Sequence, residues 1–129
     1  MAPDLVFVYG SLRRDCERPM SVRFPDSIFV ADVKVKGSLY DLGEFPGLQL
    51  DGSDSLVAGE LYQVDGGTLR QLDVFEASTN YRRKQVEISL GGDERKCWTY
   101  EPDPKFYSLG RLVASGDWVE YAKAKLDRP

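Results

Sequence analysis

The feature that most constrains the fold is a short, continuous apolar run at residues 5–9, with the sequence LVFVY. The run stops at Gly10 and Ser11, residues that are typical of turns. A continuous apolar run of this length, bounded by glycine, predicts a central strand that is buried on both faces. The rest of the chain must therefore supply two layers to cover it.

Several later segments also carry strand patterns. Residues 27–42 alternate between apolar and polar, which predicts one long strand with one face in water. Pro46 and Gly47 then indicate a turn. Residues 57–64 predict another strand, in which Gly59 marks a bulge or a close approach of another backbone.

The clearest local structure is a hairpin in the second half of the chain. Residues 85–90 (QVEISL) alternate cleanly, residues 91–94 (GGDE) turn the chain, and residues 95–101 (RKCWTYE) can return antiparallel. Pro102 and Pro104 end the returning strand.

Residues 67–76 (GTLRQLDVFE) have the spacing of a helix. Thr68 is the expected N-cap, and Leu69, Leu72 and Phe75 then share one side of the helix. These residues predict an amphipathic helix whose apolar side faces the core.

A closing helix is expected at residues 115–126, with Asp117 as its cap and Glu120 in the capping-box position. Residues 17–24 are compatible with a single helical turn. The order is strand-rich with two or three short helices, which predicts an α+β fold around a curved antiparallel or mixed sheet. With 129 residues, we expect a single domain covering residues 1–129.

Composition restricts the possible partners. The apolar fraction is 42% and the net charge is -4, so the overall field would repel nucleic acid and anionic membranes. No apolar run is long enough to span a membrane, and the N-terminus lacks the pattern of a signal peptide. Cys16 and Cys97 are expected to be free thiols in a cytoplasmic protein. Nothing in the sequence indicates the oligomeric state.

The chain contains no histidine. This excludes Ser-His-Asp and Cys-His nucleophilic catalysis, and it removes imidazole as an acid, a base or a zinc ligand. No cluster of aspartates suggests a carboxylate metal site, so no metal and no cofactor are expected. The class of enzyme that remains uses a carboxylate, a tyrosine, a lysine or a thiol for proton transfer.

Glu76 is the carboxylate in the most unusual position. Helical spacing places it between Leu69 and Leu72 on the core-facing side, where an ionised group is costly unless it is paired or used for chemistry. Three structural explanations are open: an ion pair with Arg82 or Arg83, a capping bond, or a helix that ends early. The functional alternative is a carboxylate with a pKa raised by burial, able to accept a proton and return it.

The segment VYGSL, which contains Gly10, is a second candidate. A strand that stops at Gly-Ser can leave successive backbone N–H groups pointing into a concavity that binds an anion. An ordinary turn explains the same residues. The segment YDLGEFPGL could shape the rim of a pocket or form a plain loop.

Five segments occur in one order: VFVYGSLRR, GSLYDLGEFPGL, VAGELYQVD, LRQLDVFEASTNYRR and CWTYE. This series resembles the gamma-glutamylcyclotransferase-like family, which includes the avirulence-induced plant proteins and the gamma-glutamylamine cyclotransferases. The resemblance covers residues 5–100. It implies a small, partly closed β-barrel flanked by short helices.

The resemblance also implies residue roles. Glu76 follows a Leu-Asp-x-Phe stretch and matches the family's catalytic glutamate. The residues expected to bind the substrate are Tyr9, Gly10, Ser11, Leu12, Tyr81 and Tyr100. The expected activity, of the transferase or lyase class, converts a small γ-glutamyl amide to 5-oxoproline and a free amine. A non-catalytic domain that binds a small ligand in the same pocket is the alternative.

The chain departs from the family pattern at two positions. Ala77 and Asp15 stand where family members often have glycine. Alanine is small enough to change little, whereas Asp15 could alter the mouth of the pocket. The leaving amine is not identified, and its selection is expected to depend on the loops around Asp15 and Phe45.

Overall fold

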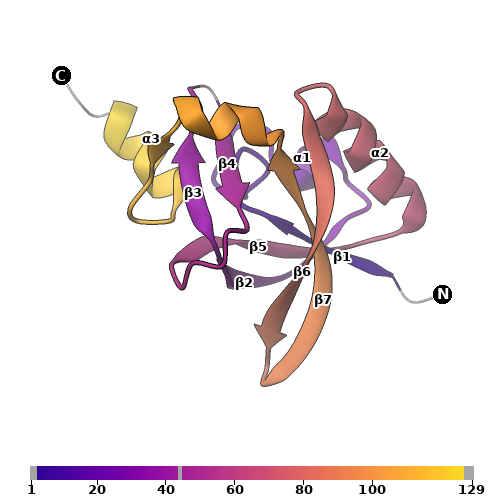
Figure 1. Cartoon of the computed structure of the whole chain (residues 1–129). Coiled ribbons are helices and arrows are strands. Elements are labelled where there is room, and N and C mark those ends of the chain that lie inside the picture. The colour runs from indigo at the N-terminus through magenta and orange to yellow at the C-terminus, as the bar shows by residue number, and fades with distance from the viewer. Residues whose placement is uncertain (1–2, 44, 127–129) are drawn as a thin grey trace.

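The structure, a computed structural model that describes residues 3–43 and 45–126, consists mainly of strands with a few short helices (Figure 1). In chain order the elements are β1 (Asp4–Val8), α1 (Met20–Arg23), β2 (Ile28–Lys36), β3 (Ser38–Asp41), β4 (Pro46–Gln49), β5 (Leu56–Val64), α2 (Gly66–Ala77), β6 (Tyr81–Leu90), β7 (Asp93–Pro102), the 3-10 helix η1 (Pro104–Leu109), β8 (Arg111–Leu112) and α3 (Trp118–Leu126). The predicted α+β class is confirmed.

Strand β1 is the middle strand of a five-stranded sheet with the order β2-β5-β1-β7-β6. It runs antiparallel to β5 and parallel to β7, so the sheet is mixed. A second sheet of three strands has the order β4-β3-β8. No pairing between described residues joins the two curved sheets, which agrees with a barrel that is only partly closed.

The apolar run of β1 is continuous because its two faces are covered by different cores. Phe7 packs toward the three-stranded sheet, with Leu39 and Leu48. Val6 and Val8 pack on the opposite face, in a second core with residues of α1 and α2. The prediction of a strand that is buried on both faces is confirmed.

The prediction of a single long strand at residues 27–42 is wrong. This segment forms two strands, β2 and β3, which belong to different sheets. Gly37 separates them with a φ of +156°, a conformation that residues with a side chain rarely adopt. The alternating pattern continues across the break, so periodicity alone does not reveal the change of sheet.

Pro46 and Gly47 do not form the predicted turn, because they begin strand β4. The chain reverses just before them, where the Leu42 N–H donates to the Phe45 carbonyl at 3.0 Å. Proline is tolerated here because it is the first residue of the strand.

Helix α2 begins two residues before Thr68, and the predicted N-cap is wrong. Asp65 is the N-cap, and its carboxylate accepts from the Thr68 N–H at 2.7 Å. Leu69 and Leu72 are buried and Phe75 packs against the same core, as predicted. The cap moves because an aspartate is available one turn earlier, and it satisfies a free N–H of the first turn.

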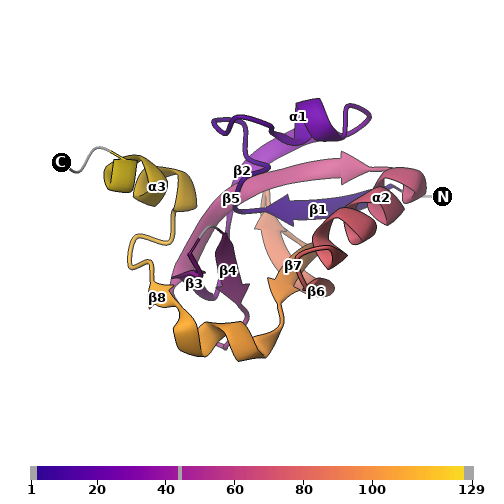
Figure 2. The same ribbon diagram turned by 90° about the horizontal axis from the view of Figure 1, so that it is seen from above.

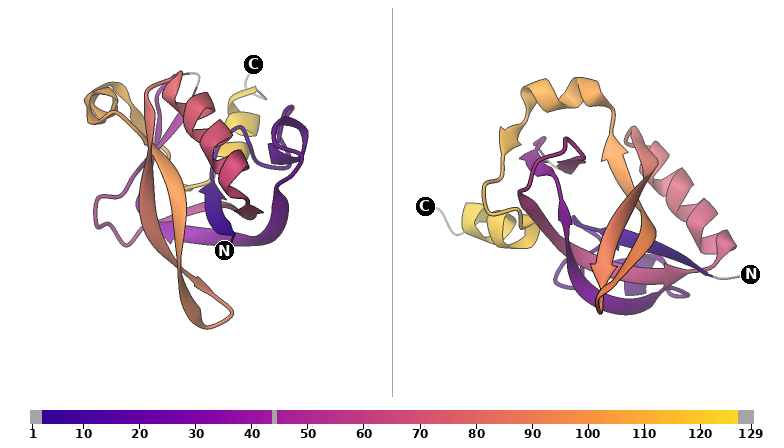
Figure 3. Two further views of the ribbon diagram at one scale, coloured as in Figure 1. Left: turned by 90° about the vertical axis from the view of Figure 1, so that its right-hand side faces the viewer. Right: turned by 60° about the horizontal axis from the view of Figure 1, so that its bottom comes forward.

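Two elements form as predicted and lie at the edges of the molecule. Strands β6 and β7 pair antiparallel, and their Gly91-Gly92 turn projects away from the sheets (Figure 3). Helix α3 is capped by Asp117, which accepts from the Glu120 N–H at 3.1 Å. Helices α2 and α3 lie at opposite ends of the molecule (Figure 2).

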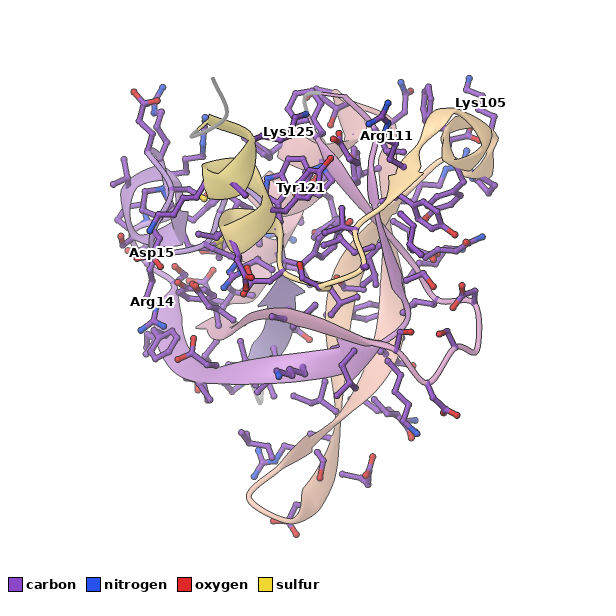
Figure 4. All side chains as sticks on the ribbon, turned by 90° about the vertical axis from the view of Figure 1, so that its left-hand side faces the viewer. Arg14, Asp15, Lys105, Arg111, Tyr121 and Lys125 are labelled. Carbon is purple, nitrogen blue, oxygen red and sulfur yellow. The ribbon has the colours of Figure 1, made fainter. Side chains whose placement is uncertain are left out.

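Helix α3 is tied to the three-stranded sheet by polar contacts. Tyr121 and Lys125 extend from the helix toward that sheet (Figure 4), and both donate to the buried carboxylate of Asp41 on β3. The helix thereby covers the open end of the first core, to which its Trp118 contributes.

Candidate active site

A cavity of about 290 Å³ is lined by the end of β1 and the loop after it, together with the C-terminal end of α2. Helix α1, the start of β4 and single residues of β6 and β7 complete its wall. All of the predicted site residues line this one cavity: Tyr9, Gly10, Ser11, Leu12, Glu76, Tyr81 and Tyr100. The fold therefore brings together segments that are up to 91 residues apart in the chain.

Glu76 lies in the last turn of α2, and its side chain is largely removed from solvent. Three phenols surround it closely enough for its charge to raise the pKa of each: those of Tyr9, Tyr81 and Tyr100. Burial is the larger cause of the rise for all three phenols. The carboxylate therefore lies among three aromatic side chains of the cavity.

The structural explanations for an inward Glu76 are not observed. Arg83 pairs with Asp73 at 3.4 Å, and Arg82 is exposed. Helix α2 continues to Ala77, so it does not end before the glutamate. Within residues 3–43 and 45–126, the Glu76 carboxylate makes no hydrogen bond and no ion pair.

Burial alone raises the pKa of Glu76, to about 7. The cause is desolvation, which penalises the charged form when no neighbour compensates for the lost water. A carboxyl group with this pKa is present in both protonation states near neutral pH. It can therefore accept and donate a proton, as a general acid and base must.

The phenols of the cavity wall are held by hydrogen bonds to other parts of the protein. The Tyr9 hydroxyl donates to the Tyr100 carbonyl at 2.6 Å, and the Tyr81 hydroxyl donates to the Pro46 carbonyl at 2.6 Å. The Tyr100 hydroxyl donates to Asp73 at 2.7 Å. These bonds fix the three rings as walls around Glu76.

The loop after β1 lines the cavity with residues 9–12. The Arg13 N–H donates to the Gly10 carbonyl at 3.1 Å, which closes a turn around Ser11 and Leu12. None of the described residues accepts a hydrogen bond from the backbone N–H of Ser11 or Leu12. A side chain at Gly10 would meet Pro46 at 2.7 Å, so the loop can approach β4 only with glycine here.

A buried charged network behind this loop was missed by sequence reasoning. Glu60 on β5 is 2% exposed, and it accepts from the Arg14 N–H at 3.0 Å and from the Tyr62 hydroxyl at 2.8 Å. The Arg13 guanidinium lies 3.5 Å from the same carboxylate and pairs with Asp117 at 2.8 Å. The one available signal was a glutamate inside the apolar strand pattern VAGELYQV.

The two residues expected at the cavity mouth differ in position. Phe45 lines the cavity, as does Arg23, which the sequence reasoning did not single out. Asp15 does not line it and is exposed, next to Arg14 on the outer side of the loop (Figure 4).

The part of the chain that the structure describes offers neither a metal site nor a membrane-spanning helix. It contains no group of three acidic, cysteine or histidine residues that could hold a metal ion. None of its helices is long and apolar enough to cross a membrane. Cys16 and Cys97 are free, as predicted.

The sequence of this chain is similar to those of known proteins. The family model described as "Gamma-glutamyl cyclotransferase, AIG2-like" matches residues 6–120. A Vibrio cholerae protein that carries gamma-glutamylcyclotransferase as a provisional name is 38% identical, over 90% of this chain and 96% of its own. A Niallia circulans protein named gamma-L-glutamyl-butirosin B gamma-glutamyl cyclotransferase is 30% identical, over 90% of this chain and 76% of its own.

A solved structure gives the same result for the fold. The crystal structure of an AIG2-like protein from Mus musculus superposes with a TM-score of 0.72 at 24% identity. The match covers 92% of this chain and 89% of the mouse chain. At this identity the likeness shows a shared fold.

Proposed function

Because the chain belongs to the gamma-glutamyl cyclotransferase, AIG2-like family and is a gamma-glutamylcyclotransferase-like enzyme, we propose that it cleaves a γ-glutamyl amide to 5-oxoproline and a free amine. The observation that carries this proposal is the Glu76 carboxyl group, which is partly buried in the cavity and has no partner among the residues that the structure describes. Burial without a partner is costly, and an acid–base role explains why it is retained.

The proposed reaction needs only one substrate. The α-amine of the γ-glutamyl group attacks the γ-carbonyl carbon of the same molecule, and a five-membered lactam forms. The two reacting groups belong to one substrate molecule, so binding that substrate in a bent conformation removes most of the entropic cost of bringing them together. A cavity of about 290 Å³ with rigid aromatic walls suits such folding of a small substrate.

Glu76 would carry the proton that this reaction must move. The attacking nitrogen gives a proton to the carboxylate as the new C–N bond forms. The protonated Glu76 then donates to the leaving nitrogen as the amide C–N bond breaks, so the carboxylate is regenerated. A pKa of about 7 makes both transfers accessible at neutral pH.

The loop residues Tyr9, Gly10, Ser11 and Leu12 would bind the γ-glutamyl head. The backbone N–H groups of Ser11 and Leu12 lack acceptors among the described residues, so they can donate to the α-carboxylate of the substrate. Tyr81 and Tyr100 would form the wall against which the substrate folds. Their hydroxyls are already bonded to the protein, which favours a shaping role over proton transfer.

The name of the Niallia circulans relative supports recognition of the γ-glutamyl head. That protein is named as a cyclotransferase of γ-L-glutamyl-butirosin B, a compound in which a γ-glutamyl group is joined to butirosin B. We infer that the γ-glutamyl head is the shared part of the substrates, and that the leaving amine differs between relatives.

The test is release of 5-oxoproline from a panel of γ-glutamyl amides by the wild type and by Glu76→Gln. We expect wild-type turnover, and a loss of about 100- to 10,000-fold in kcat with Glu76→Gln, while substrate binding is retained. Glu87→Gln is the matched control, because Glu87 is exposed on β6 and lies outside the cavity lining. Turnover by folded Glu76→Gln at the wild-type rate would overturn the proposal.

A further inference from the structure

The cavity has one charged group besides Glu76. Of its lining residues, which all belong to the described part of the chain, only Glu76 and Arg23 are charged. The remaining wall is aromatic, aliphatic or neutral and polar. A lone cation at a small, largely apolar cavity is a strong recognition element for an anionic group.

Arg23 is an exposed residue at the junction of two helices, where it lines the cavity. It is the last residue of α1, and its guanidinium carbon lies 5.0 Å from the centre of the Phe75 ring. The next residue, Phe24, is buried and packs edge-on against the same ring at 5.8 Å. Phe75 directly precedes Glu76, so this contact keeps the guanidinium at the end of α2 that carries the acid.

The guanidinium of Arg23 has no carboxylate partner in the described part of the chain. Three other arginines do, because Arg13, Arg14 and Arg83 each form ion pairs. Arg23 does not pair with Glu76 either, since burial is the sole cause of the raised pKa of that carboxyl group. Its donors are therefore available to a ligand.

We propose that Arg23 is a specificity-determining residue that binds a carboxylate on the leaving amine. The favoured substrates are then γ-glutamyl amino acids, in which a carboxylate is attached to the carbon that bears the scissile nitrogen. This inference rests on the proposed function.

The position of Arg23 favours the leaving group over the γ-glutamyl head. In the proposed reaction the α-carboxylate of the head meets the N–H groups of Ser11 and Leu12, which already supply donors for it. The leaving group must extend from Glu76 in another direction. Arg23 and Phe75 form the part of the wall that offers a charge to it.

The test uses two substrates that differ in one group, γ-glutamylglycine and γ-glutamylglycinamide. Their affinities are measured by calorimetry in the Glu76→Gln background, where the substrate is not consumed. We expect the acid to bind about tenfold more tightly than the amide. Adding Arg23→Ala should abolish this preference by weakening the acid alone, and Arg23→Lys should restore part of it because the charge returns.

Arg18→Ala is the matched control, because Arg18 is an exposed arginine in the preceding segment that does not line the cavity. It removes the same charge and should leave the preference intact. The proposal is overturned if the acid and the amide bind equally to the Glu76→Gln protein in which Arg23 is unchanged. It is also overturned if Arg23→Ala weakens the binding of both ligands equally. The second result would place Arg23 at the γ-glutamyl head.

Failure of this inference can be separated from failure of the proposed function. Release of 5-oxoproline from the same two substrates by the wild type tests the reaction, whereas the binding preference tests Arg23. Turnover without a preference would overturn only the role of Arg23.

Discussion

At the scale of single residues, the site depends on two glutamates that differ in their hydrogen-bond partners. Glu60 is almost fully buried, and its carboxylate is surrounded by donors from Arg14 and Tyr62. Glu76 is largely buried and has no partner among the described residues. The two carboxylates therefore differ in what surrounds them: hydrogen bonds hold Glu60 as a structural anchor, whereas we propose the acid–base role for Glu76, which lacks them.

The unpaired state of Glu76 predicts a pH-dependent cost in stability. Its pKa in the folded protein is about 7, above its ordinary value of 4.5, so the folded state binds the proton more tightly than the unfolded state. The contribution of Glu76 to stability is therefore fully present below pH 4.5, and it is lost as the pH rises from there through about 7. Between pH 5 and pH 8 we expect wild type to lose roughly 2 kcal/mol of unfolding free energy relative to Glu76→Gln.

Urea denaturation of both proteins at pH 5 and pH 8 measures this difference. Glu87→Gln, a substitution at an exposed site, should show no such divergence from wild type. A constant gap between wild type and Glu76→Gln at both pH values would mean that Glu76 is not desolvated.

At the scale of elements, the loop after β1 is positioned from behind by β5. Residue pairing places Val8 opposite Glu60, and the chain then turns back so that the Arg14 N–H reaches the Glu60 carboxylate. Gly59 permits this packing, because a side chain there would lie 2.4 Å from the Val8 carbonyl. The predicted close approach at Gly59 is confirmed.

Glu60→Gln should therefore weaken both the fold and substrate binding. The substitution keeps the shape but removes the anion between Arg13 and Arg14, so we expect about 2–3 kcal/mol of destabilisation and a higher KM. Tyr62→Phe removes one hydrogen bond to the same carboxylate and should cost only about 1 kcal/mol. Denaturation and steady-state kinetics on both variants test this, and an unchanged KM for a folded Glu60→Gln would contradict a positioning role.

At the scale of the whole molecule, the cavity is formed by segments that are far apart in the chain. The end of β1 and the end of α2 line it, together with the start of β4, the start of β6 and the C-terminal part of β7. The hydroxyl bonds Tyr9 to Tyr100 and Tyr81 to Pro46 connect these segments. The site is therefore a consequence of the sheet order rather than of one motif.

The sequence predicted those features that depend on local pattern. The buried strand β1, the β6–β7 hairpin, the cap of α3 by Asp117 and the inward side of α2 all follow from periodicity and turn residues. The placement of seven candidate residues around one cavity agrees with the resemblance that suggested them.

Features that depend on distant contacts were not predictable in the same way. The change of sheet at Gly37 leaves the alternating pattern intact, and the cap moved to Asp65 because two polar residues competed for one role. The contact of Glu60 with Arg14 spans 46 residues, and that of Arg13 with Asp117 spans 104. The local sequence pattern does not predict contacts between residues so far apart in the chain.

The proposed function depends most on Glu76 being an acid–base group. The most direct test is to titrate its carboxyl group by NMR. Protein labelled with 13C at glutamate carboxyl carbons would be titrated from pH 4 to pH 9, with Glu76→Gln identifying the signal. The predicted midpoint is near 7, because the carboxyl group is desolvated and none of the described residues pairs with it. A midpoint near 4.5, the ordinary value for glutamate, would contradict the account, because it would show a solvated or paired carboxylate.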